Sequence, residues 1–423
     1  MKGKIILGSI GIGLLLVLAG IFSSIKIDQQ SNLESNSKLM AEEITTEAEI
    51  EVDKQLIAAN NRFGFKLFNN IVSQTPEENI FISPASIAIA LSMASNGAEG
   101  ETLAAMTDVL ELNEIPSEDI DHAYQKLLQN LQTEDAGVKL AVANSLWADE
   151  KVKFNPAFVE DSEIFYQAQV TNLDFADSEA KNIINNWVKE KTNNKITEII
   201  DSISPDNILF LINAIYFKGN WTDKFNKELT TEKPFYFSPD NSQPHPMMSR
   251  RGEYSYYENE QFQAIRLPYG EGRVGMYIFL PKEGTEVVEF TESLTAENWQ
   301  KWTNSLRSQP GKITLPRFKL EYDTELNSAL TALGMGIAFN GDRADFSSMI
   351  SQPVSIDRVK HKTFLEVNEE GTEAAGVTSI GIRVTSAPME EKPFTMDVNR
   401  PFFCAIADKK TGNILFMGNI VKP

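Results

Sequence analysis

The chain has 423 residues, 42% of them apolar, and 59 acidic against 39 basic side chains give it a net charge of −20. This length suffices for one large domain or two medium ones, and the apolar content allows a full hydrophobic core. The acidic surface argues against nucleic acid as a partner because it repels the phosphate backbone, and a single cysteine, Cys404, excludes an intramolecular disulfide.

Residues 1–26 have the pattern of a targeting segment. Lys2 and Lys4 precede an uncharged apolar run over residues 5–22, and Lys26 follows that run. The run is longer than most signal-peptide cores and slightly short for a membrane span, so a cleaved signal peptide and an N-terminal membrane anchor both remain open. Ile21 stands where a lipid anchor would need a cysteine. Either alternative predicts an extracytoplasmic protein, secreted or anchored.

Residues 27–53 are polar and acidic and are predicted to form a linker. Residues 54–423 are predicted to form one domain, since no internal linker interrupts them. In this domain, residues 54–72 carry apolar side chains at helical spacing. The segment 79–97 predicts a short strand and then a buried helix, with Ser83 as N-cap and Pro84 in the first turn. Gly97 ends that helix, and another is expected near Glu101.

Further along, residues 137–149 alternate as a strand, and residues 178–196 form an amphipathic helical pattern. The apolar run 208–217 predicts a central strand that is buried on both faces. Residues 273–281 predict another strand, and residues 401–421 predict a hairpin with its turn at 409–412. Helices dominate the first half and strands the second, which favours an α+β fold with mixed sheets.

The segment EEGTEAAGVTSIGIRVTSAPMEEKP, residues 369–393, is long for a loop yet has the periodicity of a strand. Every second residue from Thr372 to Val384 is small or β-branched, and none is charged, whereas the intervening set holds both charges. The preceding residues already form a predicted strand, so one continuous strand would be too long. Gly371 is where the chain can bend. The pattern therefore predicts two states, an exposed loop and a strand inserted beside its own neighbour.

Five segments resemble the serpin family, the serine protease inhibitors. EVNEEGTEAAG is similar to the family's hinge motif and DVNRPFFCAI to its C-terminal signature, while NIFISPASIAIALSM, NAIYFKGNW and LPRFKLEYD follow the family order. Insertion of the serpin loop is a known example of strand addition and of stored strain, so that part comes from the family and not from this sequence. The resemblance implies an α+β serpin fold with a helix-rich N-terminal half, three mixed or antiparallel sheets and a long exposed reactive loop.

The resemblance also implies roles for individual residues. The hinge, which inserts first, would comprise Glu369, Glu370, Gly371, Thr372, Glu373, Ala374, Ala375, Gly376 and Val377. A sheet-opening cluster of polar side chains would comprise Ser83, Ser86, Asn185 and His361, with Asn213 as an additional candidate. Trp221 would lie at the top of the sheet, and Glu369 would pair with Arg317, a position where the family usually has lysine.

By resemblance, the protein is a suicide inhibitor of serine proteases. A protease attacks the loop, the cut loop inserts as a strand, and the trapped acyl-enzyme stalls because its catalytic geometry is distorted. Family spacing places the reactive bond at Thr385–Ser386, which suits elastase-like or subtilisin-like proteases; Arg383 is the alternative and Met389 a weaker one. The segment from Ser386 to Pro401 is longer than is usual in the family, which leaves the bond open.

Two other classes of function remain for comparison. A non-inhibitory serpin, acting as carrier, chaperone or scaffold, would be cleaved without forming a stable complex. An enzyme is disfavoured because the three histidines, His122, His245 and His361, lie in unrelated contexts and no nucleophile motif is present. Cys404 lies in an apolar run and is predicted to be a core residue. We expect no cofactor, no metal and no glycosaminoglycan site, and a monomer.

Overall fold

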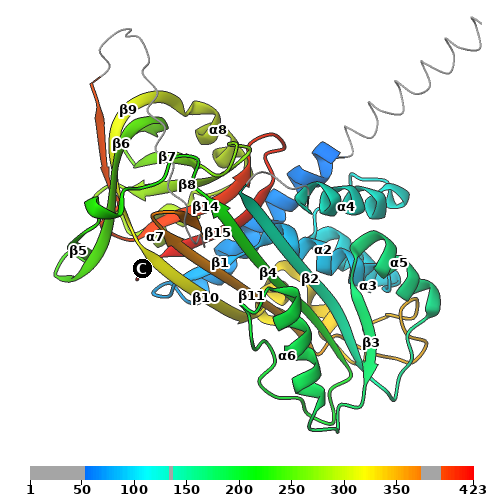
Figure 1. Cartoon of the computed structure of the whole chain (residues 1–423). Coiled ribbons are helices and arrows are strands. Elements are labelled where there is room, and N and C mark those ends of the chain that lie inside the picture. Colours follow the sequence, from blue (N-terminus) through cyan, green and yellow to red (C-terminus); the bar gives the residue numbers. More distant parts are fainter. Residues whose placement is uncertain (1–52, 133–136, 373–391) are drawn as a thin grey trace, which may run out of the picture. The chain divides into compact units, whose positions relative to one another are not determined.

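The computed structural model describes residues 53–132, 137–372 and 392–423. Residues 55–423 form one compact unit. Within the described residues, the strands form two hydrogen-bonded sheets (Figure 1). The predicted α+β class is confirmed. Three sheets were expected, but the long strand β6 (Asn241–Glu258) pairs with β5, β7 and β9 and so joins strands into a single sheet.

The larger sheet has nine strands in the described residues. Its spatial order is β1 (Ile80–Ile82), β15 (Ile414–Ile420), β14 (Phe402–Asp408), β8 (Val274–Pro281), β7 (Phe262–Pro268), β6, β9 (Arg307–Pro316) and β13 (Phe394–Asp397), with β5 (Thr231–Ser238) paired to β6. The predicted strand 273–281 and the hairpin 401–421 are thereby confirmed. Gly412, with φ +79°, lies in the hairpin turn at the place the sequence indicates.

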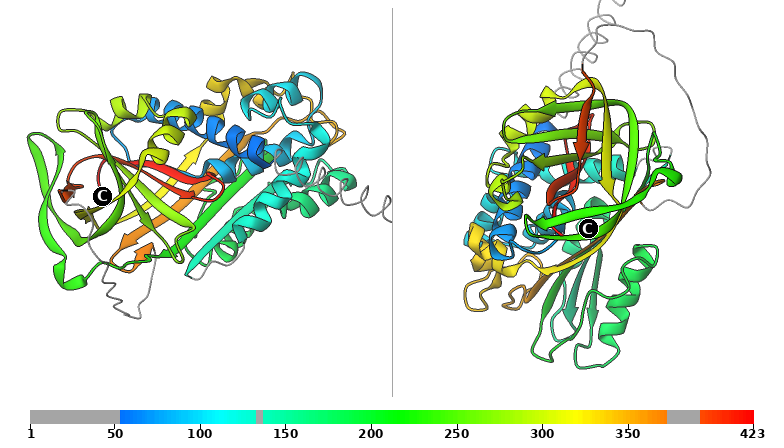
Figure 2. Two further views of the ribbon diagram at one scale, coloured as in Figure 1. Left: turned by 90° about the horizontal axis from the view of Figure 1, so that it is seen from above. Right: turned by 90° about the vertical axis from the view of Figure 1, so that its left-hand side faces the viewer.

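The six-stranded sheet contains the predicted central strand. Its order is β10 (Phe318–Glu325), β11 (Arg358–Asn368), β12 (Gly371–Thr372), β4 (Leu209–Asn220), β2 (Val138–Asp149) and β3 (Gln169–Leu173). In Figure 2, left, β11 in orange runs beside β10 in yellow and β4 in green. Because β4 has a partner strand on both sides and a core on both faces, its sequence is apolar without alternation.

Alternate residues of β4 belong to different cores. Phe210, Ile212 and Ala214 pack with Ile184 and other residues of α6 (Ala180–Lys191) on one face of the sheet. Ile215 and Phe217 belong to the larger core that includes the nine-stranded sheet. Figure 1 shows α6 on the outer face of the six-stranded sheet.

The buried helix predicted after Ser83 is α2 (Pro84–Ser95), and all twelve of its residues are buried. Ser83 accepts a hydrogen bond from the backbone N–H of Ser86 and caps the helix, as predicted. Gly97 lies beyond the helix end, where an added Cβ would come 2.4 Å from Cβ of Met349, so close packing also requires glycine there.

The remaining helices surround the two sheets. The first runs over residues 53–74. It is followed by α3 (Gly100–Val109), α4 (Ser117–Gln132), α5 (Pro156–Tyr166), α7 (Val287–Glu292), α8 (Ala296–Ser305) and α9 (Asn327–Leu330), with short helical turns at Lys227–Leu229, Thr331–Met335 and Gly336–Phe339. Cys404 on β14 is fully buried, as predicted, and burial raises the pKa of its thiol well above the usual range.

Candidate functional site

β12 lies between β11 and β4, two strands that pair directly with each other over most of their length. It pairs antiparallel with residues 367–368 of β11 on one side and residues 219–220 of β4 on the other. Further along, β11 and β4 pair directly in parallel, ending with Phe364 opposite Tyr216. β12 therefore separates the ends of these two strands. We call the position between β11 (358–368) and β4 (209–220), which β12 occupies at one end, the insertion slot.

Gly371 forms the bend that carries the chain from β11 into the insertion slot. Its φ is +147°, and an added Cβ would lie 2.1 Å from the carbonyl oxygen of Gly219 and 2.8 Å from the backbone nitrogen of Trp221. Both are backbone atoms of the paired strand region, so neither can move aside cheaply. Only glycine fits this position.

Trp221, predicted at the top of the sheet, contacts the turn that precedes β12. Its backbone N–H donates to the carbonyl oxygen of Glu370 at 2.9 Å, and its indole Nε1–H donates to that of Asn368 at 2.9 Å. Its ring stacks on the ring of Tyr269, with centroids 4.4 Å apart and planes inclined by 10°. The turn is thus held by both backbone and side-chain hydrogen bonds.

Tyr269 bonds directly to the hinge. Its hydroxyl lies 2.6 Å from Oγ1 of Thr372, and both residues are fully buried. Burial raises the pKa of Tyr269 well above its usual value, so the hydroxyl keeps its proton. Sequence reasoning missed Tyr269 because it is distant in the chain and carries no motif of its own.

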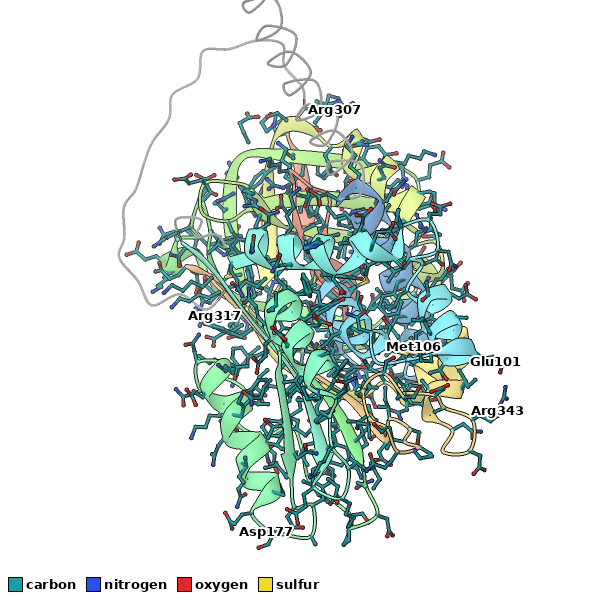
Figure 3. All side chains as sticks on the ribbon, turned by 90° about the vertical axis from the view of Figure 1, so that its right-hand side faces the viewer. Glu101, Met106, Asp177, Arg307, Arg317 and Arg343 are labelled. Carbon is teal, nitrogen blue, oxygen red and sulfur yellow. The ribbon has the colours of Figure 1, made fainter. Side chains whose placement is uncertain are left out.

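The predicted ion pair between Glu369 and Arg317 is present. Glu369 Oε1 accepts hydrogen bonds from Arg317 Nη2 and, at 2.6 Å, from Thr230 Oγ1. Burial alone would raise the pKa of Glu369, but these hydrogen bonds outweigh burial and the pKa is lowered. Figure 3 labels Arg317 towards one end of the six-stranded sheet and Asp177 at the other, so the pair marks the end where β12 is inserted.

Glu370 makes a second set of ion pairs that the sequence did not reveal. Its carboxylate accepts from Lys224 Nζ at 2.6 Å and from Lys227 Nζ at 3.0 Å. These hydrogen bonds lower the pKa of Glu370 against the opposing effect of burial. The two hinge carboxylates that the structure describes, those of Glu369 and Glu370, are therefore ionised and paired with cations from other elements.

His361 belongs to a buried hydrogen-bond network, here called the His361 network, with Ser83, Ser86, Asn213 and Asn144. The backbone N–H of Ser83 donates to His361 Nε2 at 3.1 Å, so the proton resides on Nδ1, which donates to Asn213 Oδ1 at 2.6 Å. The amide of Asn213 in turn donates to the carbonyl oxygen of Ser86 at 3.2 Å and to Oδ1 of Asn144.

The His361 network crosses the insertion slot. His361 is on β11 and Asn213 is directly opposite on β4, so their 2.6 Å hydrogen bond joins the two strands by their side chains. Burial lowers the pKa of His361 to about 3, and the imidazole is neutral. A strand inserted at this level would have to break that bond.

The structure brings three of the four predicted residues of the sheet-opening cluster together and leaves the fourth apart. Asn185 on α6 bonds instead to its own neighbourhood: it donates to the carbonyl oxygen of Ile200 at 2.8 Å and accepts from the N–H groups of residues 199 and 200. It belongs to the core on the outer face of the sheet, because β4 separates α6 from α2. Asn213, the additional candidate, takes the central place, and Asn144 is a member that the sequence did not indicate.

The remaining predicted hinge residues lie outside the described residues. They are Glu373, Ala374, Ala375, Gly376 and Val377, together with the reactive-bond candidates Arg383, Thr385, Ser386 and Met389. The chain is described again from residue 392, and β13 then pairs in parallel with β9. Phe394 stacks on Tyr256 with centroids 3.8 Å apart and covers Gly311, where a Cβ would lie 2.2 Å from its ring. The described strands that precede and follow the segment 373–391, β12 and β13, therefore each belong to a sheet.

Comparison with known proteins identifies relatives of this chain in sequence and in structure. The model of the family described as Serpin (serine protease inhibitor) matches residues 58–423. Human leukocyte elastase inhibitor is 38% identical over 88% of this chain and 100% of its own, and bovine Serpin B8 is 37% identical over 87% and 99%. The crystal structure of the thermophilic serpin tengpin in its native state superposes with a TM-score of 0.80 at 33% identity, covering 87% of this chain and 94% of its own.

The prediction of an extracytoplasmic protein, secreted by a signal peptide or held by an anchor, is wrong. The leukocyte elastase inhibitor and Serpin B8 relatives are intracellular clade B serpins. The prediction depended on residues 1–26, which lie outside the described residues, and on lysines flanking an apolar run, a pattern that does not by itself identify export. None of the helices in residues 53–132, 137–372 and 392–423 has the length and apolar character of a membrane span.

Proposed function

Since the chain belongs to the serpin family, we propose that it traps serine proteases by inserting its cleaved reactive loop into the six-stranded sheet. One observation carries the proposal for this chain: β12 already lies between β11 and β4. Its two residues make the backbone pairing that the rest of the loop would extend. The function is inhibition, and the relatives are protease inhibitors rather than enzymes.

The register of β12 fits continued insertion without sliding of the flanking strands. Thr372 lies between Val367 of β11 and Gly219 of β4, and this pair keeps the same register as the directly paired Phe364 and Tyr216. Insertion therefore needs the two strands to move apart sideways, and their axial register can stay as it is. This is the least costly way to add a strand, because each flanking strand keeps its pairing on its other side.

Continuation of this register would direct the uncharged face of the segment into the larger core. Thr372 points towards Tyr269, and side chains on one strand alternate between faces, so even-numbered residues would follow it inward. This is the small or β-branched set noted in the sequence. Residue 378, a threonine, would arrive between His361 and Asn213. Its hydroxyl can both donate and accept, so it can replace the hydrogen bond that insertion breaks.

The chemistry needs only the protease's own nucleophile. The serine hydroxyl of the protease attacks the carbonyl carbon of Thr385, the bond to the nitrogen of Ser386 breaks, and an ester forms as the new amine leaves. Hydrolysis of that ester would release the protease, so insertion must occur first. Thr385–Ser386 remains the proposed reactive bond and Arg383 the alternative. A small residue at 385 suits elastase-like or subtilisin-like proteases, and one relative is named an elastase inhibitor.

The inhibitory unit is proposed to be residues 54–423, acting as a monomer without cofactor or glycosaminoglycan. The alternative is a non-inhibitory serpin that acts as carrier, chaperone or scaffold. The ordered pairing of Gly371 and Thr372 in the insertion slot favours inhibition, because a passive loop has no need of a preformed strand position. The alternative predicts cleavage without trapping.

The test mixes the full chain with pancreatic elastase, subtilisin and trypsin, followed by denaturing gels and mass spectrometry of the released C-terminal peptide. A complex that survives SDS and boiling is the expected result, and the first residue of the peptide identifies the bond. Cleavage near Thr385 that leaves the protease free and active would contradict trapping and support the alternative.

A further inference from the structure

The bond between Tyr269 and Thr372 links the hinge to a part of the molecule that insertion need not move. Tyr269 directly follows β7 in the nine-stranded sheet, whereas Thr372 is the last described residue before the segment 373–391. The two hydroxyl oxygens are 2.6 Å apart, and neither residue is exposed. The bond therefore fixes the inner face of β12 at the start of the loop.

Tyr269 is itself held rigidly. Its backbone N–H donates to the carbonyl oxygen of Val274 at 2.9 Å, and the neighbouring Gly270 N–H donates to that of Asn220 at 2.9 Å. Its ring stacks on Trp221 and also contacts Gly219, where an added Cβ would come 2.8 Å from the tyrosine ring. The hydroxyl position is thus determined by packing and backbone pairing that exist without the hinge.

Loss of the tyrosine hydroxyl would leave a buried threonine hydroxyl without this partner. An unsatisfied buried hydroxyl disfavours the buried position, so Thr372 would leave the insertion slot more often. A hinge outside the slot must return before the strand can extend. During that delay the acyl-enzyme can hydrolyse, and the protease escapes.

We propose that Tyr269 is a positioning residue that keeps Thr372 in the first inserted register and so sets the ratio of protease trapping to protease release. The inference rests on the proposed inhibitory function and adds a residue that determines its efficiency. Tyr269 contacts the loop, within the described residues, through its hydrogen bond to Thr372. It acts through Thr372 alone, so its effect should depend on that hydroxyl.

The experiment uses the full chain and the protease with which the unaltered protein forms its SDS-stable complex. The measured quantities are the number of inhibitor molecules consumed per protease trapped and, separately, the rate of attack on the loop. For Tyr269→Phe we expect the ratio of trapping to release to fall about three- to tenfold, the range that one buried hydrogen bond contributes. Thermal unfolding, measured in parallel, identifies any general loss of stability.

Companion variants separate positioning from a merely structural role. Thr372→Val should match Tyr269→Phe, Thr372→Ser should retain most of the trapping, and the double variant Tyr269→Phe/Thr372→Val should be no worse than either single variant, since both remove one bond. Tyr124→Phe is the matched control. It removes a fully buried hydroxyl that donates to Asn60 Oδ1 at 2.9 Å, far along the chain on α4, and should leave the ratio unchanged.

An unchanged ratio in Tyr269→Phe or Thr372→Val would overturn the inference, as would an equal loss in Tyr124→Phe. Additive losses in the double variant would also overturn it, because they would place the two hydroxyls in separate roles. If the unaltered protein forms no stable complex with any protease, the proposed function fails first and this inference falls with it. If the unaltered protein traps and the variants trap equally well, only the inference fails.

Discussion

Replacement of Gly371 by alanine tests whether the preformed strand position depends on this one backbone bend. The added Cβ would approach the carbonyl oxygen of Gly219 to 2.1 Å, Cα of Asn220 to 2.7 Å and the nitrogen of Trp221 to 2.8 Å. Separations this short are well inside van der Waals contact, and all three atoms belong to backbone. We expect Gly371→Ala to expel β12 from the insertion slot.

The expected size of the effect follows from the free-energy costs of two alternatives, keeping the bend and expelling β12. Alanine at the φ of +147° strains the backbone by about 1–3 kcal/mol if the bend is kept. Expulsion instead sacrifices the pairing on both sides of β12 and the bond between Thr372 and Tyr269, at about 0.5–1.5 kcal/mol for each hydrogen bond, or a few kcal/mol together. Since the steric overlap adds to the backbone strain, expulsion of β12 costs less free energy than keeping the bend.

Gly412 supplies a matched control. Its φ is +79°, so alanine there meets a comparable backbone penalty, but no atom lies within 4 Å of the added Cβ. Hydrogen exchange measured by mass spectrometry on peptides that cover residues 366–372 should show lost protection in Gly371→Ala and normal protection in Gly412→Ala. The trapping ratio should fall at least about tenfold in the first variant, which corresponds to 1.4 kcal/mol, and should stay constant in the second.

Retained amide protection at residues 366–372 in Gly371→Ala would refute the steric argument. Equal losses in both variants would show that a general loss of stability, and not the contact with β4, decides the outcome. Lost protection with unchanged trapping would mean that the strand position at Thr372 has no part in the efficiency of inhibition.

Four further predictions concern the buried polar groups. Asn213→Ala leaves several partners in the His361 network unsatisfied and should lower the free energy of unfolding in urea by about 2–4 kcal/mol; a loss below 1 kcal/mol would contradict the central place given to it. His361 is neutral in the fold with a pKa of about 3, against 6.5 for an unperturbed histidine, so the unfolded chain binds the extra proton. Stability should therefore be complete above pH 6.5 and fall towards pH 3 by up to about 1.4 kcal/mol per pH unit, and His361→Gln should lack this component. Glu369→Gln should lower the free energy of unfolding by about 1–3 kcal/mol because the Glu369 side chain is only 2% exposed. Glu370→Gln should lower it by less than about 1 kcal/mol because one of the two lysine partners of Glu370 is 63% exposed. Equal losses in the two variants would contradict this ranking. The thiol of Cys404, fully buried with a raised pKa, should react with a thiol reagent only upon unfolding, and rapid labelling of the folded protein would contradict the core assignment.

Local signals in the sequence were sufficient to predict most of the helices and strands. Ser83 before Pro84 marks the start of a buried helix, and the apolar run 208–217 marks the central strand, because capping and burial on both faces act over a few residues. The family motifs were sufficient to predict the ion pair between Glu369 and Arg317, which are distant in sequence and meet in the structure. Asn185 shows the limit of such matching, since a polar residue in the expected motif lies on the opposite face of the sheet.

The sequence by itself determined that residues 369–393 have a face suited to burial and that Gly371 is the point where the chain can bend. Only the tertiary structure decided where the chain enters the sheet, since Gly371 and Thr372 pair between β11 and β4. The slot between β11 and β4, the bond from Tyr269 to Thr372, and the bridge from His361 to Asn213 each join residues more than 100 positions apart. Such pairs carry no local pattern, because their meeting depends on how whole sheets pack and not on the conformational preference of either residue.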